Sequence, residues 1–102
     1  MTLYIAGPMT GMPDHGLPAF ARAAEDLAGA GYEVINPGEP GVDPDKTWAD
    51  YMRRDLAWLL TCSAVATLPG WENSRGARLE VHVAEALEMP VRPVKEWIAD
   101  GR

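Results

Sequence analysis

Short apolar runs alternate along this chain with amphipathic stretches, and that alternation limits the folds it can adopt. The runs cover residues 2–6, 32–36, 64–68 and 91–94. The third is nearly continuous in apolar residues, which is typical of a strand covered on both faces. Strands that alternate with helices favour a parallel sheet. We therefore expect an α/β fold in three layers, with a small parallel sheet of about four strands and helices on both faces.

Three stretches between the runs have apolar residues at helical spacing. They span about residues 18–30, about 47–60, and from 73 or 74 to an end before Pro90. Thr47 and Asp50 form a weak capping box at the start of the second stretch. A last short helical turn is expected around Trp97.

The segments after the first three runs form the expected ligand site. Open parallel sheets bind ligands beyond the carboxyl ends of their strands. These segments cover residues 7–16, 36–46 and 69–76. The second is rich in Gly and Pro and is therefore a loop.

Composition and charge narrow the class of protein. The 102 residues are expected to form one domain over residues 1–102. Fifteen acidic and nine basic residues give a formal net charge of −6, which disfavours nucleic acid and anionic membranes as partners. A small anionic ligand is compatible with this charge, because local donors hold such a ligand.

The cysteine and histidine pattern excludes several kinds of site. The single cysteine, Cys62, excludes an internal disulfide and a thiolate-rich metal site, and it favours a reducing compartment. His15 and His82 have no metal-ligand spacing. No stretch approaches ~18 apolar residues, and the start of the chain lacks a signal-peptide pattern. We expect a cytoplasmic protein with no membrane span, metal site or cofactor.

A glycine-rich segment follows the first apolar run. Its sequence is Gly7-Pro8-Met9-Thr10-Gly11. Backbone N–H groups in such a loop can approach a phosphate or a sugar closely. The segment lacks the spacing of the dinucleotide fingerprint and of the P-loop. It is either a ligand cradle or an ordinary connection between a strand and a helix.

A second candidate cradle lies at the start of the third helix. Ser74 can cap this helix, and Gly76 allows a ligand to approach its first turn, where free N–H donors suit a phosphate. Arg75 or Arg78 can add positive charge. A plain N-cap is the alternative for Ser74. Trp71, on the preceding loop, either stacks on a base or packs in the core or an interface.

A glutamate interrupts the apolar face of the third helix. With successive residues ~100° apart around the axis, this face consists of Ala77, Val81, Ala84 and Leu87. Glu80 falls inside it. An ionised carboxylate on an inward face is costly unless it is hydrogen-bonded or opens onto a cavity. Glu80 is therefore either a functional carboxylate beside the cradle or a residue that reaches solvent from a partly buried face.

The second helix repeats this pattern. Its apolar face consists of Trp48, Met52, Leu56 and Leu59. Asp55 lies in the middle of that face. Either Asp55 has a catalytic role, or Arg53, Arg54 or a backbone partner satisfies it and makes it a folding or subunit-contact residue. Two carboxylates and a hydroxyl around a small-ligand cradle indicate acid–base or nucleophilic chemistry on a sugar.

Four segments carry a resemblance to a known family. They are Tyr4-Ile5-Ala6-Gly7-Pro8-Met9-Thr10-Gly11, Asn36-Pro37, Arg54-Asp55-Leu56-Ala57-Trp58-Leu59, and Ser74-x-Gly76-x-x-x-Glu80. With these segments the chain resembles the nucleoside 2-deoxyribosyltransferase-like superfamily, above all its short members, which include deoxynucleoside 5′-monophosphate N-glycosidases and uncharacterised small proteins. The resemblance covers nearly the whole chain. It implies a flavodoxin-like fold and cleavage of an N-glycosidic bond.

The resemblance also implies roles for individual residues. Glu80 corresponds to the nucleophilic carboxylate that attacks the anomeric carbon, and Tyr4 to the tyrosine that positions it. Ser74 and Gly76 correspond to the cradle for a phosphate or 5′ end, and residues 7–11 surround the sugar and phosphate. Members usually form dimers or larger homo-oligomers, with sites near subunit contacts.

One position departs from the family pattern. Members commonly carry an aspartate just before the third strand, where it assists catalysis by contacting the base or sugar. This chain has Ser63 there, which by its place in the family pattern is expected to bind substrate, but a hydroxyl is a poor general acid at neutral pH. Either Asp55, Glu72 or a neighbouring subunit replaces the aspartate, the leaving group needs less help, or activity is lost. The loop between the second strand and second helix is also short for base recognition.

Two functions from different classes follow. The first is hydrolysis or transfer at the N-glycosidic bond of a nucleoside or nucleotide through Glu80. The second is a nucleotide-binding sensor or sequestering protein without turnover, which Ser63 favours. A structural homo-oligomer with a decayed site is a third interpretation.

Overall fold

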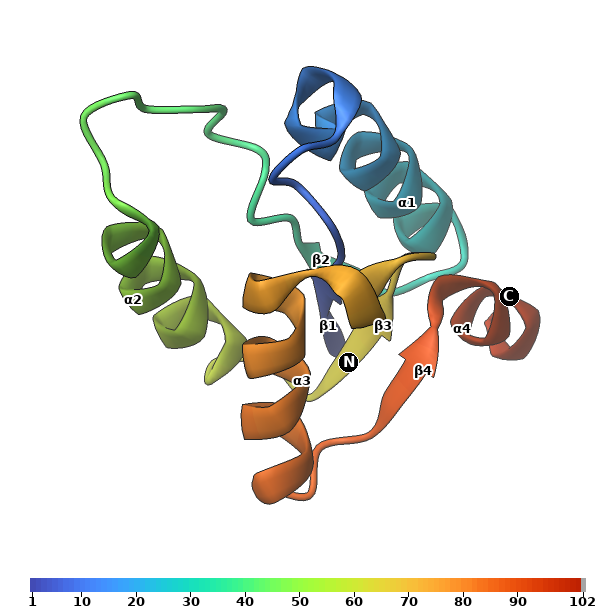
Figure 1. Cartoon of the computed structure of the whole chain (residues 1–102). Coiled ribbons are helices and arrows are strands. Elements are labelled where there is room, and N and C mark those ends of the chain that lie inside the picture. The colour runs from blue at the N-terminus through green and yellow to red at the C-terminus, as the bar shows by residue number, and fades with distance from the viewer. Residues whose placement is uncertain (102) are drawn as a thin grey trace.

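The computed structural model describes residues 1–101, whose four strands form one parallel sheet in the order β2-β1-β3-β4 (Figure 1). The strands are β1 (Thr2–Ala6), β2 (Glu33–Ile35), β3 (Ala64–Thr67) and β4 (Val91–Pro93). Thr2 of β1 pairs with Glu33, and Leu3 pairs with Ala64. This order matches the first four strands of the flavodoxin-like arrangement. The predicted α/β fold is confirmed.

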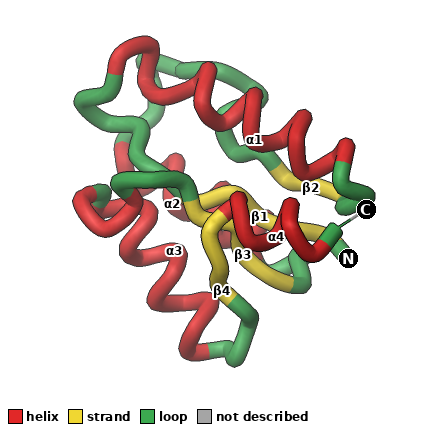
Figure 2. The backbone as a smooth tube through the Cα atoms, turned by 90° about the vertical axis from the view of Figure 1, so that its right-hand side faces the viewer, coloured by secondary structure: helices red, strands yellow, loops and turns green. Residues whose placement is uncertain are grey.

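Helices cover both faces of this sheet (Figure 2). They are α1 (Leu17–Gly29), α2 (Trp48–Leu59), α3 (Arg75–Ala86) and α4 (Val94–Asp100), with short 3-10 turns η1 (Pro13–Gly16) and η2 (Trp71–Asn73). α1 and α4 pack on one face, and α2 and α3 on the other. None of the helices within residues 1–101 is long and apolar enough to cross a membrane.

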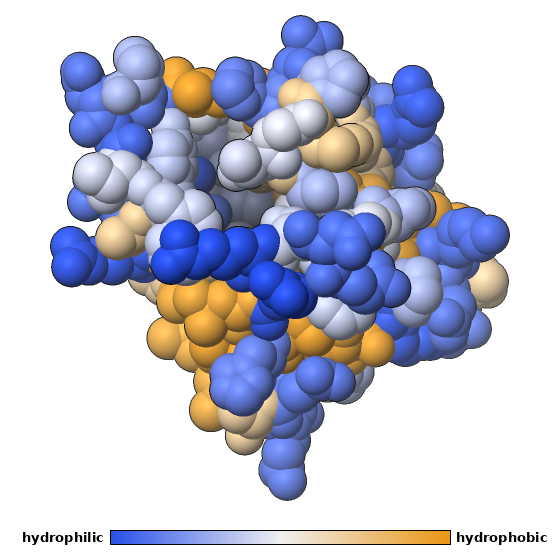
Figure 3. Space-filling view, in the orientation of Figure 1, coloured by the Kyte–Doolittle hydropathy of each residue, from blue (hydrophilic) through white to orange (hydrophobic). Residues whose placement is uncertain are grey.

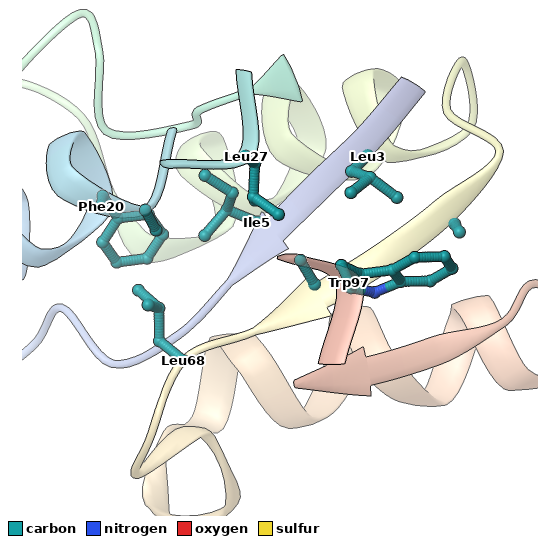
Figure 4. Packing of buried hydrophobic residues seen from close by; sticks show 9 residues of the cluster. Leu3, Ile5, Phe20, Leu27, Leu68 and Trp97 are labelled. Carbon is teal, nitrogen blue, oxygen red and sulfur yellow. The ribbon is translucent and has the colours of Figure 1, made fainter. Parts of the chain in front are cut away.

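The first core layer lies between the sheet and the helices α1 and α4 (Figure 4). Leu3 and Ile5 of β1 point to this face and pack with Phe20 and Leu27 of α1 and Trp97 of α4. The Trp97 indole N–H donates to a main-chain carbonyl of β3 at 2.9 Å. Its polar atom is therefore satisfied inside the core.

The second core layer lies between the sheet and the helices α2 and α3, and it leads to the site. Side chains alternate along a strand, so Tyr4 and Ala6 point to this face. They pack with Leu59 of α2 and with Ala77 and Val81 of α3. Tyr4 is fully buried, and its hydroxyl therefore needs a polar partner inside the protein.

Element boundaries differ from the prediction by a few residues. β2 is shorter than the expected strand at 32–36. α3 begins at Arg75, one residue after the later of the two predicted starts, and ends at Ala86, before Pro90 as predicted. Glu88 has a φ of 60°, which turns the chain toward β4. Leu87 lies beyond the helix and is exposed, so its predicted place on the apolar face is wrong. The capping box is confirmed: Thr47 Oγ1 accepts from the Asp50 N–H at 3.1 Å, and the Asp50 carboxylate accepts from the Thr47 N–H at 3.0 Å.

Candidate functional site

A cavity of about 370 Å³ opens at the carboxyl ends of the strands, where the sequence predicts a ligand site. Its walls come from the loops after β1 and β2, from α2 and from the start of α3. Figure 3 shows a hollow in the molecular surface, bordered below by strongly hydrophilic side chains. The predicted site residues that line the cavity are Gly7, Met9, Thr10, Gly11, Asp55, Ser74, Gly76 and Glu80.

Glu80 lines the cavity from the second turn of α3. The hydroxyl of Tyr4, in β1, donates a hydrogen bond to Glu80 Oε2. Glu80 is only 5% exposed and Tyr4 is 0% exposed. The alternative in which Glu80 reaches solvent from a partly buried face is therefore wrong, because its carboxyl is buried against Tyr4.

Burial sets the proton affinity of this pair. Burial is the largest effect and raises the pKa of Glu80 to about 8. The hydrogen bond from Tyr4 lowers this pKa, and the negative charge of Asp55 raises it. Burial and the charge of Glu80 also raise the pKa of Tyr4 far above its usual value. Tyr4 therefore acts as a neutral donor, and Glu80 can hold or release a proton near neutral pH.

Asp55 lines the same cavity from α2. Arg54 donates to Asp55 Oδ1 through Nε at 3.0 Å, and its Nη2 lies 2.9 Å from the same oxygen. Burial raises the pKa of Asp55, while Arg54 and Lys46 oppose that rise. Of the partners predicted for Asp55, the structure shows Arg54. Asp55 lines the cavity in this pairing.

The start of α3, where the sequence predicts the second cradle, borders the cavity through Ser74 and Gly76. Ser74 Oγ accepts from the Ala77 N–H at 3.3 Å, which confirms Ser74 as the N-cap. The N–H groups of Arg75 and Gly76 precede the first hydrogen bond within the helix. A Cβ on Gly76 would lie 3.2 Å from the sulfur of Met52. Glycine therefore lets α3 approach α2 closely at the cavity wall.

The glycine-rich loop contributes four of its five predicted residues. Pro8 is the exception: it does not line the cavity, and its carbonyl oxygen would be 2.4 Å from a Cβ on Gly16. Gly16 has a φ of 73°, which also favours glycine. The structure therefore gives Pro8 a role in the shape of the loop rather than in lining the cavity.

Ser63 lies at the opposite edge of the sheet. It is exposed, it comes directly before β3, and its N–H donates to the Thr2 carbonyl at 2.9 Å. The cavity is at the carboxyl ends of the strands. The expectation that Ser63 binds substrate in this cavity is therefore wrong, and the missing aspartate does not remove a group from its wall.

Trp71 supports the core rather than the cavity wall. It lies in η2, is half-buried and packs against the buried cluster that contains Tyr4 and Ala6. Of the two alternatives for Trp71, stacking on a base or packing in the core, the structure shows packing in the core of this chain. Glu72, its neighbour, is exposed, whereas Asp55 is the second carboxylate on the cavity wall.

Sequence reasoning missed several aromatic and basic residues of the wall. Trp48, Tyr51 and His15 line the cavity. The guanidinium of Arg75 lies 3.7 Å from the centre of the Trp48 ring, a cation–π contact at the start of α3. Trp48 was identifiable as a member of the apolar face of α2, but its position on that face did not show that it would border a cavity.

The loop after β2 forms one wall of the cavity through Pro37, Gly38, Gly41 and Val42. The Tyr51 hydroxyl donates to the main-chain carbonyl of Asp43 at 2.8 Å and accepts from its N–H at 2.6 Å. This wall of the cavity is thus a short loop that Tyr51 fastens to α2.

Within residues 1–101, no three His, Cys, Asp or Glu side chains come together as a metal site.

A family model matches residues 1–92, and its description is Domain of unknown function (DUF4406). The chain belongs to the DUF4406 family. The matched range contains every residue that lines the cavity, so the cavity lies within the DUF4406 part of the chain. No curated protein gives a match. The resemblance to the nucleoside 2-deoxyribosyltransferase-like superfamily stays a prediction.

Proposed function

We propose that this protein cleaves the N-glycosidic bond of a nucleoside or nucleotide, with Glu80 as the nucleophile. The observation that carries the proposal is the buried carboxyl of Glu80, hydrogen-bonded to Tyr4 and placed on a cavity wall that also holds Asp55. Burying two carboxyl groups in one small site is costly for a merely structural purpose. Perturbed carboxyls in a cavity are instead typical of catalytic sites.

In the first step, the ionised Glu80 carboxylate attacks the anomeric carbon of the sugar. Tyr4 holds Oε2, which leaves Oε1 as the attacking oxygen. A bond forms between Oε1 and the anomeric carbon, and the bond from that carbon to the base nitrogen breaks. The electron pair of the broken bond goes to the base, which takes a proton from Asp55.

In the second step, the sugar leaves Glu80. The Asp55 carboxylate removes a proton from water, and the resulting oxygen nucleophile attacks the anomeric carbon and releases the Glu80 carboxylate. A second base in place of water gives transfer instead of hydrolysis. The active form of the pair therefore carries one proton, with Glu80 ionised and Asp55 protonated. Burial raises the pKa of Glu80 to about 8, whereas Arg54 and Lys46 oppose the rise at Asp55, so the resting pair holds its proton mainly on Glu80 and the active form is the less populated arrangement of that proton.

The start of α3 suits the anionic end of such a ligand. Ser74, Gly76 and the N-terminal dipole of a 12-residue helix offer donors and partial positive charge. Arg75 adds a full positive charge beside them. A cavity of about 370 Å³ is within the size range of small-ligand sites, and its aromatic wall residues can contact a base.

The partners in this proposal are a small nucleoside or nucleotide and further copies of this chain. Figure 3 shows apolar side chains gathered over α2 and α3, below the hollow. Half-buried apolar residues of these helices are Leu56, Leu79 and Val83. Such a patch supports a homo-oligomer. A cytoplasmic location with Cys62 reduced belongs to the same proposal.

The test measures, by chromatography, the release of free base from a panel of ribonucleoside and deoxyribonucleoside monophosphates. We expect release by the unaltered protein and a loss of at least about 10³-fold in Glu80→Gln, because an amide cannot act as this nucleophile. Glu85→Gln is the matched control, since Glu85 is exposed on the same helix. Equal release by Glu80→Gln and the control would overturn the proposal. Tight binding of intact nucleotide without release by any form would favour the sensor or sequestering function.

A further inference from the structure

Arg54 occupies an unusual position on α2, between two aromatic rings. Its guanidinium carbon lies 5.1 Å from the centre of the Tyr51 ring and 4.6 Å from that of Trp58. Its side chain is 19% exposed. Aromatic rings at such distances attract a guanidinium through cation–π contacts and restrict its movement. The charged end of Arg54 is thus held in one place on the cavity wall.

From that place Arg54 contacts two parts of the site. It donates to Asp55 Oδ1 through Nε at 3.0 Å, and Nη2 donates to the Pro37 carbonyl at 2.9 Å. Pro37 begins the part of the β2–α2 loop, residues 37–42, that contributes one wall of the cavity. A single planar group therefore connects a carboxylate of the site to the loop that faces the ligand space.

We infer that Arg54 is a positioning residue, which holds the Asp55 carboxylate and the loop at residues 37–42 in one fixed arrangement. The kinetic part of this inference rests on the proposed glycosidic-bond cleavage. Its structural part does not. Arg54 also lines the cavity, but the effect inferred here passes through Asp55 and the loop.

The surroundings of Asp55 show why Arg54 has this effect. The charged and titratable groups around Asp55 are Arg54 on its own helix, Lys46 from the β2–α2 loop, Glu80 on α3 and Tyr4 on β1. His15 lines the same cavity from the loop after β1. Of the ion pairs found within residues 1–101, the one that involves Asp55 is made with Arg54. Removal of Arg54 therefore takes away the main force that keeps Asp55 ionised.

The first experiment measures Asp55 directly and needs no activity. The ¹³Cγ chemical shift of Asp55 is titrated in the unaltered protein, Arg54→Gln and Arg53→Gln. We expect its midpoint to rise by about 1 pH unit or more in Arg54→Gln. Arg53→Gln removes the same charge from the neighbouring, exposed position and should change the midpoint little. A midpoint in Arg54→Gln equal to that in Arg53→Gln would overturn the inference.

The second experiment separates charge from position with Arg54→Lys. Lysine keeps the charge but lacks the planar fork that donates to Asp55 and Pro37 together. We expect amide exchange of Gly38 and Gly41 to become at least about tenfold faster in this variant, because the loop loses its anchor. Exchange as slow as in the unaltered protein would contradict a positioning role. This variant also covers the case in which Arg54→Gln does not fold, since its charge is retained.

The third experiment tests the kinetic consequence. In Arg54→Lys we expect kcat for base release to fall by about tenfold or more, with a smaller change in KM. In Arg54→Gln the acidic limb of the pH profile should move to higher pH. A kcat and an acidic limb equal to those of Arg53→Gln would overturn the kinetic part. If the unaltered protein releases no base, the proposed function fails, and the titration and exchange experiments still decide the role of Arg54.

Discussion

Tyr4 and Glu80 are 76 positions apart in the chain, and the hydroxyl of the first donates a hydrogen bond to the carboxyl of the second inside the protein. Tyr4 lies in β1, in the interior of the sheet, and Glu80 lies in α3, which packs over that face. The contact therefore fixes the carboxyl relative to the most rigid part of the fold. In the proposed mechanism the second carboxyl oxygen is the one that attacks the sugar.

Replacement of Tyr4 by Phe should shift the proton affinity of Glu80 upward. The hydrogen bond from Tyr4 lowers the pKa of Glu80, so its removal favours the protonated form. We expect kcat for base release to fall by about tenfold or more and the alkaline limb of the pH profile to move to higher pH. Stability should fall by about 1–3 kcal/mol, because the buried carboxyl loses its donor.

Tyr32→Phe is the matched control for that prediction. The Tyr32 hydroxyl donates to the Trp97 carbonyl at 2.7 Å on the other face of the sheet. This variant loses a comparable hydrogen bond away from the cavity. A pH profile that moves equally in both variants would show that the shift has no connection with Glu80.

The pH dependence of base release should be bell-shaped. The active form holds one proton on the Glu80–Asp55 pair, and burial raises the pKa of both carboxyls. The alkaline limb of kcat/KM should therefore lie near the pKa of Glu80, about 8. In Asp55→Asn the residual activity should instead rise with pH through that value, since only ionisation of Glu80 remains. A falling alkaline limb in this variant would contradict the assignment.

Stability should depend on pH through Glu80. Its pKa rises from 4.5 to about 8 on folding, so the folded chain binds this proton more tightly than the unfolded chain does. The contribution is fully present below about pH 4.5 and is lost as pH rises through 8. The unaltered protein should therefore lose stability as pH rises between these two values, whereas Glu80→Gln does not have this titration. The unfolding free energy of Glu80→Gln minus that of the unaltered protein should increase by about 3–5 kcal/mol over this pH range. Urea titrations at several pH values measure this, and Glu85→Gln should show no such gain.

The sequence predicts the fold well because its strongest signals are local. The apolar run at residues 64–68 has no competing interpretation once the flanking helices are recognised, and the observed strand, Ala64–Thr67, is buried throughout. The capping box at Thr47 and Asp50 is also a contact between near neighbours. Element ends are less predictable, because the end of α3 depends on the positive φ of Glu88.

The site is only partly predictable, for a physical reason. Glu80 and Asp55 are recognisable because a carboxylate on an apolar helix face has few stable explanations. The cavity walls depend on how loops pack against helices: Tyr51 fastens the β2–α2 loop through Asp43, and no local pattern indicates this contact. The substrate contact expected for Ser63 follows from the resemblance alone, whereas a residue directly before a parallel strand lies at its amino end, away from the edge where ligands bind.

Asp55→Asn should be selective in the substrates it impairs. If Asp55 protonates the departing base, its loss should reduce kcat/KM by about 10²–10⁴-fold for an ordinary nucleotide. A nucleotide whose base already carries a positive charge, such as an N7-methylated purine, needs no proton to leave. Its kcat/KM, which reports bond cleavage and not the later hydrolysis that also uses Asp55, should fall by less than about tenfold. Asp26→Asn, at an exposed position of α1, is the control, and equal losses on both substrates would remove Asp55 from the role of acid.

Gly76→Ala should weaken binding more than chemistry. The added Cβ would lie 3.2 Å from the Met52 sulfur and would crowd the wall beside Ser74. We expect KM for a nucleoside monophosphate to rise by about tenfold, with kcat changed by less than about threefold, because in the proposed mechanism the start of α3 holds the phosphate and takes no part in bond cleavage. The unphosphorylated nucleoside should be affected less. Gly29→Ala is the control, since the structure leaves open space for a Cβ there. An equal rise in KM for nucleoside and nucleotide would place the phosphate away from the start of α3.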